Sequence, residues 1–247
     1  MHTDRKRLSV VGIGPGEESQ LTGLAVQTLV ESDLIVGYTV YVELIREIFP
    51  EKEFLSTPMM RETERCRAAL AAADEGKRVA LVCSGDAGVY GMASPVLALA
   101  KDYPEVSVSV IPGVTAALSG AALLGSPLTG DFAVISLSDR LTPMEHIEKR
   151  LRLAARGGFC ICLYNPESRS RSGYLARAVR ILMEELSGDT VCGAAKNIGR
   201  EGEVCEVMTL EKLLTYEADM FTTVFIGNEN TENIGGSMVT PRGYRDL

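Results

Sequence analysis

This chain has very few histidines, no closely spaced cysteines and no long apolar segment. Among 247 residues the histidines are His2 and His146, so histidine catalysis and histidine-held metals are not expected. The six cysteines show no C-x-x-C spacing, and no run of about eighteen apolar residues occurs. These absences argue against zinc, haem, iron–sulfur and membrane-spanning proteins. We expect buried free thiols and, with no export signal evident, a cytoplasmic location.

The charge balance is acidic, which narrows the range of partners. A formal net charge of −8 disfavours non-specific binding to nucleic acid, because proteins that bind phosphate backbones usually carry a basic face. Arginines still gather locally, around Arg150 and Arg152 and again around Arg169 and Arg171. Taken by themselves, such clusters are more often solvated helix or loop faces than binding sites.

The order of apolar runs predicts an α/β protein. Short β-branched runs alternate with helical patterns in the first half, which is typical of a mostly parallel sheet. In the second half several strand-like runs are separated by few helices, which indicates a mixed sheet. Glycine and proline interrupt the chain at residues 125–127, so we expect two α/β domains, 1–125 and 126–247, with the ligand cleft between them.

Three glycine-bearing turns follow predicted strands of the first half. The first, V-V-G-I-G-P-G-E (10–17), contains Pro15, which has no N–H to offer a phosphate. The others are S-G-D-A-G-V-Y-G (84–91) and I-P-G-V-T-A-A (111–117). Because strands of a parallel sheet end at the same edge, these turns outline one crevice for a ligand without phosphates.

Individual polar residues in these motifs admit two interpretations. Asp86 either contacts a ligand or caps the helix that follows. Thr115 could cap its helix, contact a ligand, or do both, because a helix N-terminus presents free N–H groups. Asp139, in I-S-L-S-D-R-L-T-P, is either a general acid or base or part of a turn and helix cap.

The motifs in this order resemble the tetrapyrrole (corrin/porphyrin) methyltransferase family, the S-adenosylmethionine enzymes of cobalamin and sirohaem synthesis. The resemblance rests on G-I-G-P-G, S-G-D-A-G-V-Y-G, P-G-V-T-A and T-T-V-F-I-G, spread over nearly the whole chain. Three further stretches, D-F-A-V-I-S-L-S-D-R-L-T-P, Y-N-P-E-S-R-S-R and T-P-R-G-Y, resemble the branch that methylates carbon 17 of precorrin-3B.

The resemblance implies the tetrapyrrole methylase fold and a defined set of site residues. S-adenosylmethionine is expected in a folded conformation, leaving S-adenosylhomocysteine as product, with contacts from Pro15, Gly85, Asp86, Val89, Thr115, Ala116, Leu163, Asn197 and Thr222. The substrate, precorrin-3B or its cobalt form, is methylated and its ring contracted. Its carboxylates are expected to pair with Arg169, Arg171, Arg200 and Arg242, while Asp139, Ser136 and Tyr164 are the candidates for proton transfer. The family also implies a homodimer, and no metal site is expected.

Two positions depart from the branch, and three alternatives stay open. Gly130 stands where histidine is usual, and Met144 where tryptophan is usual. The alternatives are a methylase for another precorrin carbon, a non-catalytic sensor of S-adenosylmethionine, and a nicotinamide-dependent oxidoreductase. The last requires an intact phosphate-binding turn and an acid ending the second strand, and the nearest acid, Asp33, comes at the start of that strand.

Overall fold

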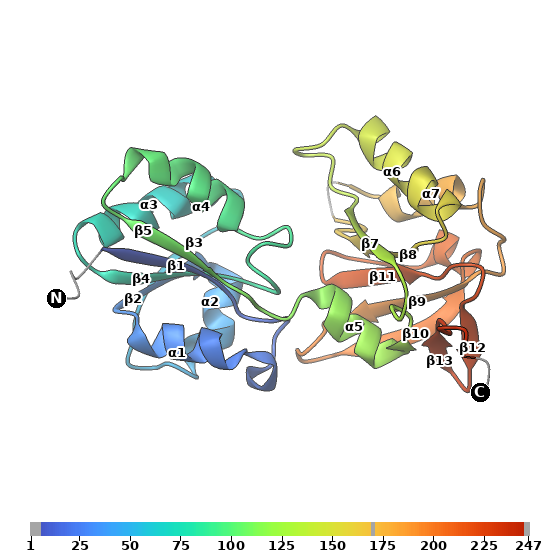
Figure 1. The fold of residues 1–247 in the computed structure, drawn as a ribbon, viewed down its shortest axis with the longest axis horizontal. Coiled ribbons are helices and arrows are strands. Elements are labelled where there is room, and N and C mark those ends of the chain that lie inside the picture. The colour runs from blue at the N-terminus through green and yellow to red at the C-terminus, as the bar shows by residue number, and fades with distance from the viewer. Residues whose placement is uncertain (1–5, 169–170, 245–247) are drawn as a thin grey trace. The chain divides into compact units, whose positions relative to one another are not determined.

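The computed structural model describes residues 6–168 and 171–244, which form two compact α/β units that divide after Thr115 (Figure 1). We expected the division at residue 125. The difference arises because helix α5 (Ala116–Leu124) packs on the sheet of the second unit. A Cβ atom on Gly120 would lie 2.8 Å from the Phe225 ring, so the helix lies directly against that sheet.

The first unit is built on a parallel five-stranded sheet with strand order β3-β2-β4-β1-β5. Each strand is followed by a helix or a long crossover, as parallel pairing requires. The strands are β1 (Arg7–Gly12), β2 (Leu34–Tyr38), β3 (Glu53–Thr57), β4 (Arg78–Cys83) and β5 (Ser107–Ile111). The helices are α1 (Gly23–Glu31), α2 (Thr39–Arg46), α3 (Glu62–Asp74) and α4 (Ala93–Leu99), with short 3-10 turns at Glu18–Gln20 and Ala100–Asp102.

Helices cover both faces of this sheet, so its central strands are apolar on both sides. Leu8 and Val10 of β1 pack with α3 and α4, whereas Val11 packs with α1 and α2. Each of these side chains is fully buried, and such burial contributes about 1.5–3 kcal/mol per side chain. This two-sided burial explains why the strands appear in the sequence as continuous apolar runs.

The second unit has a mixed five-stranded sheet with strand order β10-β9-β11-β8-β7. Only β7 and β8 pair in parallel, and the remaining neighbours are antiparallel. The strands are β7 (Phe132–Ser136), β8 (Cys160–Tyr164), β9 (Val191–Lys196), β10 (Val204–Thr209) and β11 (Thr222–Ile226). A small sheet, β12-β13-β6, is formed by Glu232–Ile234, Ser237–Val239 and Gly125–Ser126.

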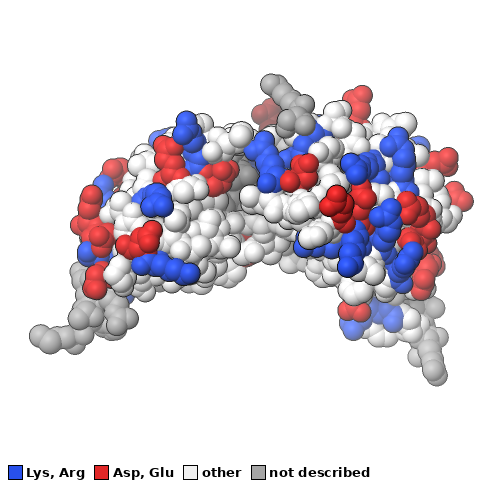
Figure 2. Space-filling view, turned by 90° about the horizontal axis from the view of Figure 1, so that it is seen from above, with Lys and Arg blue, Asp and Glu red and all other residues white. Residues whose placement is uncertain are grey.

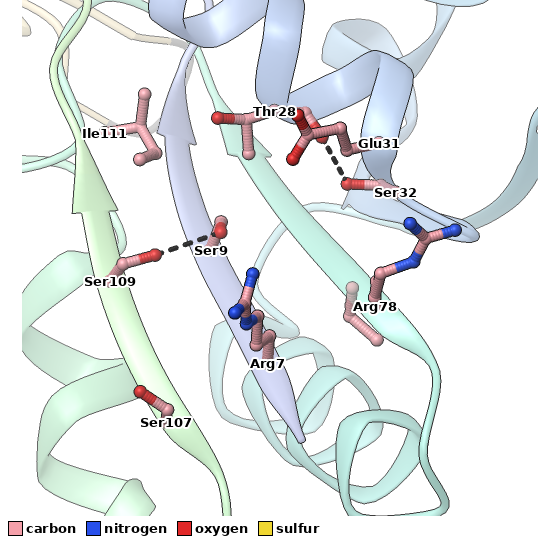
Figure 3. A pocket seen from close by; sticks show the side chains of 10 residues that line it. Arg7, Ser9, Thr28, Glu31, Ser32, Arg78, Ser107, Ser109 and Ile111 are labelled. Atoms are coloured by element: carbon pink, nitrogen blue, oxygen red, sulfur yellow. Dashed lines mark hydrogen bonds between the residues drawn. The ribbon is translucent and has the colours of Figure 1, made fainter. Parts of the chain in front are cut away.

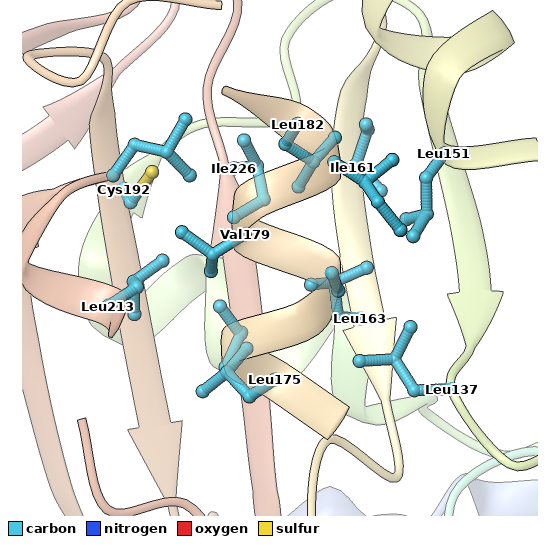
Figure 4. Close-up of a cluster of buried hydrophobic side chains, with 14 of the residues drawn as sticks. Leu137, Leu151, Ile161, Leu163, Leu175, Val179, Leu182, Cys192, Leu213 and Ile226 are labelled. Carbon is cyan, nitrogen blue, oxygen red and sulfur yellow. The ribbon is translucent and has the colours of Figure 1, made fainter. Parts of the chain in front are cut away.

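Helices α6 (Met144–Arg156) and α7 (Tyr174–Leu182), with a 3-10 turn at Lys212–Thr215, pack against one face of the second sheet. Ile147, Leu151 and Ala155 recur every four residues on α6 and are buried, which is the stripe of an amphipathic helix. Figure 4 shows Leu175, Val179 and Leu182 of α7 directed into the same core.

The strand runs expected in the second half all form strands, β7 to β11, and the mixed sheet is confirmed. The small sheet and β3 were not anticipated. Five of the six cysteines are buried free thiols, but Cys205 is exposed on β10, which corrects the expectation for that residue. Within the described residues, no helix has the length and apolar character needed to cross a membrane.

Charged side chains of both signs intermingle on the face of the molecule shown in Figure 2. Ion pairs occur within α6 and between α6 and the segment formed by α7 and the turn after it. Arg152 pairs with Glu184, Arg156 with Glu185, and both Arg152 and Arg177 with Glu148. Arg152, which looked like part of a basic cluster in the sequence, is therefore a solvated helix-surface residue.

Candidate functional site

The three glycine turns of the first unit meet at the carboxyl ends of the adjacent strands β4, β1 and β5, as the sequence predicts. Gly14 and Gly85 exchange backbone hydrogen bonds of 3.1 and 2.7 Å. A Cβ atom on Gly12 would lie 2.6 Å from the Gly85 carbonyl oxygen, and one on Gly113 would lie 2.2 Å from the same oxygen. Glycine is required at positions 12 and 113 because three stretches of main chain are in contact there.

Asp86 joins two of these turns through its carboxylate. Its Oδ1 accepts hydrogen bonds from the N–H groups of Gly88 (2.8 Å) and Val89 (3.1 Å), and its Oδ2 accepts one from Gly113 (2.9 Å). The helix after this loop begins at Ala93, so Asp86 is not its cap. The capping alternative is therefore wrong for Asp86, whose carboxylate instead connects the loops after β4 and β5.

The remaining predicted donor contacts of the first unit lie in the same three turns. Pro15 is buried after β1, and Gly85 has a positive φ of 69° that favours glycine. Val89 is half-buried in the loop after β4, and Thr115 follows the turn after β5. These residues therefore gather at one edge of the sheet.

A hollow of about 550 Å³ lies on one face of the first sheet, along β1 and β5 and beside α1 (Figure 3). Its lining includes Arg7 and Arg78, which begin β1 and β4, and it contains none of the residues predicted for the site. Arg78 is held by Asp33 through two side-chain hydrogen bonds of 2.6 and 3.1 Å. The Arg78 guanidinium and main-chain N–H lower the pKa of Asp33 to about 2, so this acid has a structural partner at the amino ends of the strands.

In the second unit the predicted residues gather at one edge of the mixed sheet. Strands β7, β8 and β9 run in the same direction and β11 runs against them. Ser136, Tyr164 and Asn197 therefore follow or end their strands at the edge where Thr222 begins β11. Leu163 is one residue before the end of β8, and its side chain is fully buried in the core beneath α7, so only its main chain is near this edge.

Two motifs separated in the sequence are tied together at this edge, and we call their three contacts the seam. Asn165 Nδ2 donates to Ser136 Oγ at 3.0 Å, and Arg171 Nη1 donates to Ser138 Oγ at 3.0 Å. Tyr174 Oη donates to Asp139 Oδ2 at 2.8 Å.

The loop after β8 is held at its far end as well. The Glu167 carboxylate accepts hydrogen bonds from the N–H groups of Gly173 (3.0 Å) and Leu175 (3.4 Å), which caps helix α7. The described residues of the loops after β7 and β8 are thus connected to each other and to the helix that follows.

The three residues predicted for proton transfer have different hydrogen-bond partners. The hydroxyl of Ser136 accepts hydrogen bonds from Asn165 and from the Ser138 N–H. Tyr164 Oη accepts a hydrogen bond of 2.7 Å from the Ala117 N–H. Asp139 is exposed, and its hydrogen bond raises the pKa of the Tyr174 hydroxyl. These contacts place all three side chains at the same sheet edge.

Asp219 organises two of the predicted donor contacts, and sequence reasoning missed it. Its carboxylate accepts hydrogen bonds from Thr222 Oγ1 (3.0 Å) and the Phe221 N–H (2.8 Å) and pairs with Lys196 Nζ at 2.7 Å. The Phe221 carbonyl in turn accepts from the Asn197 N–H at 3.1 Å. Burial opposes the charged form of Asp219, but the Lys196 ammonium and these donors outweigh it and lower the Asp219 pKa.

Three non-glycine residues at these strand ends adopt a left-handed backbone. Tyr90, Asn165 and Asn197 each have φ of 53°. Asparagine tolerates this conformation, whereas for tyrosine it costs about 1 kcal/mol or more. Such strain tends to concentrate in functional loops, and here it is found in the loops after β4, β8 and β9.

The four predicted arginines have different surroundings. Arg169 lies outside the described residues. Arg171 is buried in the seam, and Arg200 lies in the turn after β9 with its guanidinium 5.1 Å from the Phe221 ring centre. Arg242 is exposed in the tail after β13. The structure therefore brings Arg171 and Arg200 to the sheet edge that holds the other predicted residues of the second unit.

Residues 7–214 match the family model described as Tetrapyrrole (Corrin/Porphyrin) Methylases. The chain belongs to this family. Among the relatives of this tetrapyrrole methylase is a probable cobalt-factor III C(17)-methyltransferase of Salmonella typhimurium, 46% identical over 96% of this chain and 99% of that protein. A precorrin-3B C(17)-methyltransferase of a Sinorhizobium species is 37% identical over 96% of both chains.

Solved structures agree with this assignment. The crystal structure of the methyltransferase CobJ superimposes with a TM-score of 0.87, with 38% identity over 95% of this chain and 99% of that one. A uroporphyrin-III C-methyltransferase of Thermus thermophilus, crystallised with S-adenosylhomocysteine, has a TM-score of 0.69 over 90% of this chain and 97% of that one. Its 21% identity shows a shared fold only. The tetrapyrrole methylase fold expected from the motifs is confirmed.

Proposed function

We propose that this methylase transfers a methyl group from S-adenosylmethionine to carbon 17 of precorrin-3B, or of its cobalt-containing form, and contracts the macrocycle during cobalamin biosynthesis. The observation that carries the proposal is the seam, because through Ser136, Ser138 and Asp139 it connects two of the three stretches that resemble the carbon-17 branch. The relatives named for carbon-17 methylation match over almost the whole chain and support the same reaction.

The glycine turns of the first unit fit a donor that lacks phosphates. Pro15 offers no N–H, and the Asp86 carboxylate already accepts three backbone N–H groups, so the turns present main chain and small side chains. Pro15, Gly85, Asp86, Val89, Thr115 and Ala116 would hold the donor, with the main chain of Leu163, Asn197 and Thr222 as further contacts. The bound donor supplies an electrophilic methyl group. The residues of the chain then have to hold donor and carbon nucleophile in line, an effect that contributes on the order of 7–11 kcal/mol.

Proton transfer during ring contraction is assigned to the polar edge of the second sheet. Asp139 is exposed there, and Ser136 Oγ is held by Asn165. Tyr164 Oη accepts a hydrogen bond from the Ala117 N–H, and a phenol hydroxyl can both accept and donate a proton. Each of these groups is within the proposal a candidate general acid or base.

The proposal also includes the assembly and the location of the enzyme. We infer a cytoplasmic homodimer, as the family resemblance implies. Large apolar side chains remain exposed in both units, such as Leu24 and Val30 on α1 and Leu118 on α5. Contact between two copies would remove part of this apolar surface from water. Light scattering of the purified protein measures the assembly directly.

Mass spectrometry tests the proposed reaction. The protein is incubated with S-adenosylmethionine and either precorrin-3B or the cobalt-containing substrate, and the product is scored for one added methyl group and for a ring-contracted chromophore. Product from one substrate supports the proposal and identifies the metal state. Donor binding without product from either substrate would contradict it, and would favour a methylase for another precorrin carbon or a sensor.

A further inference from the structure

Arg171 is a buried cation for which the described part of the chain provides no acidic partner. It is 9% exposed, and none of the ion pairs between described residues includes it. Its Nε is buried and has no hydrogen-bond partner among those residues. Taking a charge out of water is unfavourable unless a partner compensates, so an unpartnered buried donor of this kind requires an explanation.

The free donor lies on a particular edge of the guanidinium. Arg171 Nη1 donates a hydrogen bond to Ser138 Oγ at 3.0 Å. The buried Nε belongs to the other edge of the guanidinium, which Nε and Nη2 form together. That edge presents two parallel N–H groups and matches the two oxygens of a carboxylate.

Other arginines of this chain show what the same edge binds. Arg78 presents Nε and Nη2 to the Asp33 carboxylate at 3.1 and 2.6 Å, and Arg152 presents them to Glu184 at 2.8 and 3.1 Å. Arg65, which is also buried without an acid, uses Nε and Nη2 for Thr57 Oγ1 and the Pro58 carbonyl.

Arg171 is held in place through both its side chain and its backbone. The contact with Ser138 fixes it to the loop after β7, and its backbone N–H donates to the Ser168 carbonyl at 2.9 Å. The neighbouring contacts of Asn165 and Tyr174 hold the same two loops together. The guanidinium is therefore fixed before any ligand arrives, which lowers the entropic cost of binding.

We propose that the Nε and Nη2 edge of Arg171 binds one carboxylate of the tetrapyrrole substrate and selects substrates that carry an acidic side chain at that position of the ring. This inference rests on the proposed function, because it assigns one contact within the same site. Arg242, by contrast, is exposed in the tail after β13.

The test compares Arg171→Lys and Arg171→Gln with the wild type in steady-state methyl transfer. Lysine keeps the positive charge but loses the two parallel N–H groups of the guanidinium, and glutamine loses both the charge and this pair of donors. We expect the KM for the tetrapyrrole to rise about tenfold in the lysine variant and about a hundredfold in the glutamine variant, in line with charged hydrogen bonds. The kcat is expected to stay within about threefold, and calorimetry is expected to give an unchanged donor affinity. Arg180→Gln, an exposed arginine on α7, is the matched control.

A binding measurement keeps this inference separate from the proposed reaction. Uroporphyrin III, which carries acidic side chains around its ring, is titrated by absorbance against wild type, Arg171→Gln and Arg180→Gln. Weaker binding to the Arg171 variant alone supports the contact even if the wild type methylates neither substrate, in which case only the proposed function fails. Equal KM values and equal uroporphyrin affinity in all proteins would overturn the inference. So would a fall in kcat at unchanged KM, or a loss of donor affinity in Arg171→Lys.

Discussion

Tyr164 Oη accepts a 2.7 Å hydrogen bond from the N–H of Ala117, in the first turn of α5. The first N–H groups of a helix have no partner within it, so the phenol at the end of β8 acts as a cap for that helix. Ala116, a proposed donor contact, is the residue before Ala117. Tyr164 is therefore placed to position the start of α5, in addition to any part in proton transfer.

Tyr164→Phe distinguishes these two roles. Loss of the cap is expected to lower the free energy of unfolding by about 0.5–1.5 kcal/mol and to weaken donor affinity, while the pH–rate profile of methyl transfer keeps its shape. Urea denaturation, donor calorimetry and kcat between acidic and alkaline pH provide the three readings. Disappearance of one limb of the pH profile, with donor affinity unchanged, would show proton transfer by Tyr164 instead.

Asp86 is expected to control donor binding through the loops that it joins. Asp86→Ala removes three hydrogen bonds that hold the turns after β4 and β5, so we expect a loss of about 1–3 kcal/mol in stability and a donor affinity lowered roughly tenfold or more. Asp86→Asn keeps one oxygen acceptor and is expected to be intermediate. Calorimetry with S-adenosylmethionine measures the effect, and an unchanged affinity in the alanine variant would remove Asp86 from the donor site.

The ion pair of Asp33 and Arg78 predicts a contribution to acid stability. The pKa of Asp33 is depressed from 3.8 to about 2 by Arg78, so the stabilisation is complete above pH 3.8 and is lost as the pH falls towards 2. Both side chains are substantially exposed, so the contribution is at most about 1 kcal/mol. Denaturation of wild type and Asp33→Asn at several acidic pH values measures it. The difference between the two proteins should shrink as the pH falls, and a constant difference would contradict the assignment.

Gly130 is expected to tolerate histidine, the residue usual at this position in the carbon-17 branch. A Cβ atom built there has no heavy atom within 4 Å, and the position is exposed. We therefore expect Gly130→His to change the free energy of unfolding by less than about 0.5 kcal/mol. Thermal denaturation measures this, with Gly113→His as the contrasting variant, since a side chain there would collide with main chain. A large destabilisation of Gly130→His would contradict this prediction, because it would mean that the added side chain collides with neighbouring atoms.

Thiol reactivity should separate Cys205 from the other cysteines. Burial raises the pKa of Cys66 and Cys83 to about 11 and of Cys162 and Cys192 to about 12, and Cys160 is buried as well. In the native protein we expect an aromatic disulfide reagent to modify Cys205 rapidly and the buried thiols only after unfolding. Cys205→Ser provides the control, and rapid labelling that persists in this variant would contradict the prediction.

Much of the fold was predictable because its signals are local. The alternation of apolar runs and the glycine turns are properties of neighbouring residues, and they place β1, β4 and β5 correctly. The division at residue 125 was expected from a glycine and proline break, yet packing of α5 on Phe225, far away in the sequence, assigns that helix to the second unit.

The site was predictable in its location more than in the role of each side chain. Strand ends identify the two sheet edges, but hydrogen bonds between distant residues decide what each group does. Nothing near Asp219 in the sequence reveals its contact with Lys196, and Tyr164 looked like an acid or base until its partner, Ala117, was known. The partners of Arg171 were unforeseeable for the same reason, since Ser138 is contributed by another strand end.

The most direct test of the central claim is NMR of the product formed from S-adenosylmethionine with an isotopically labelled methyl group. We predict that the label appears on carbon 17 of a ring-contracted tetrapyrrole. A label on any other carbon, or on a macrocycle that has not contracted, would contradict it.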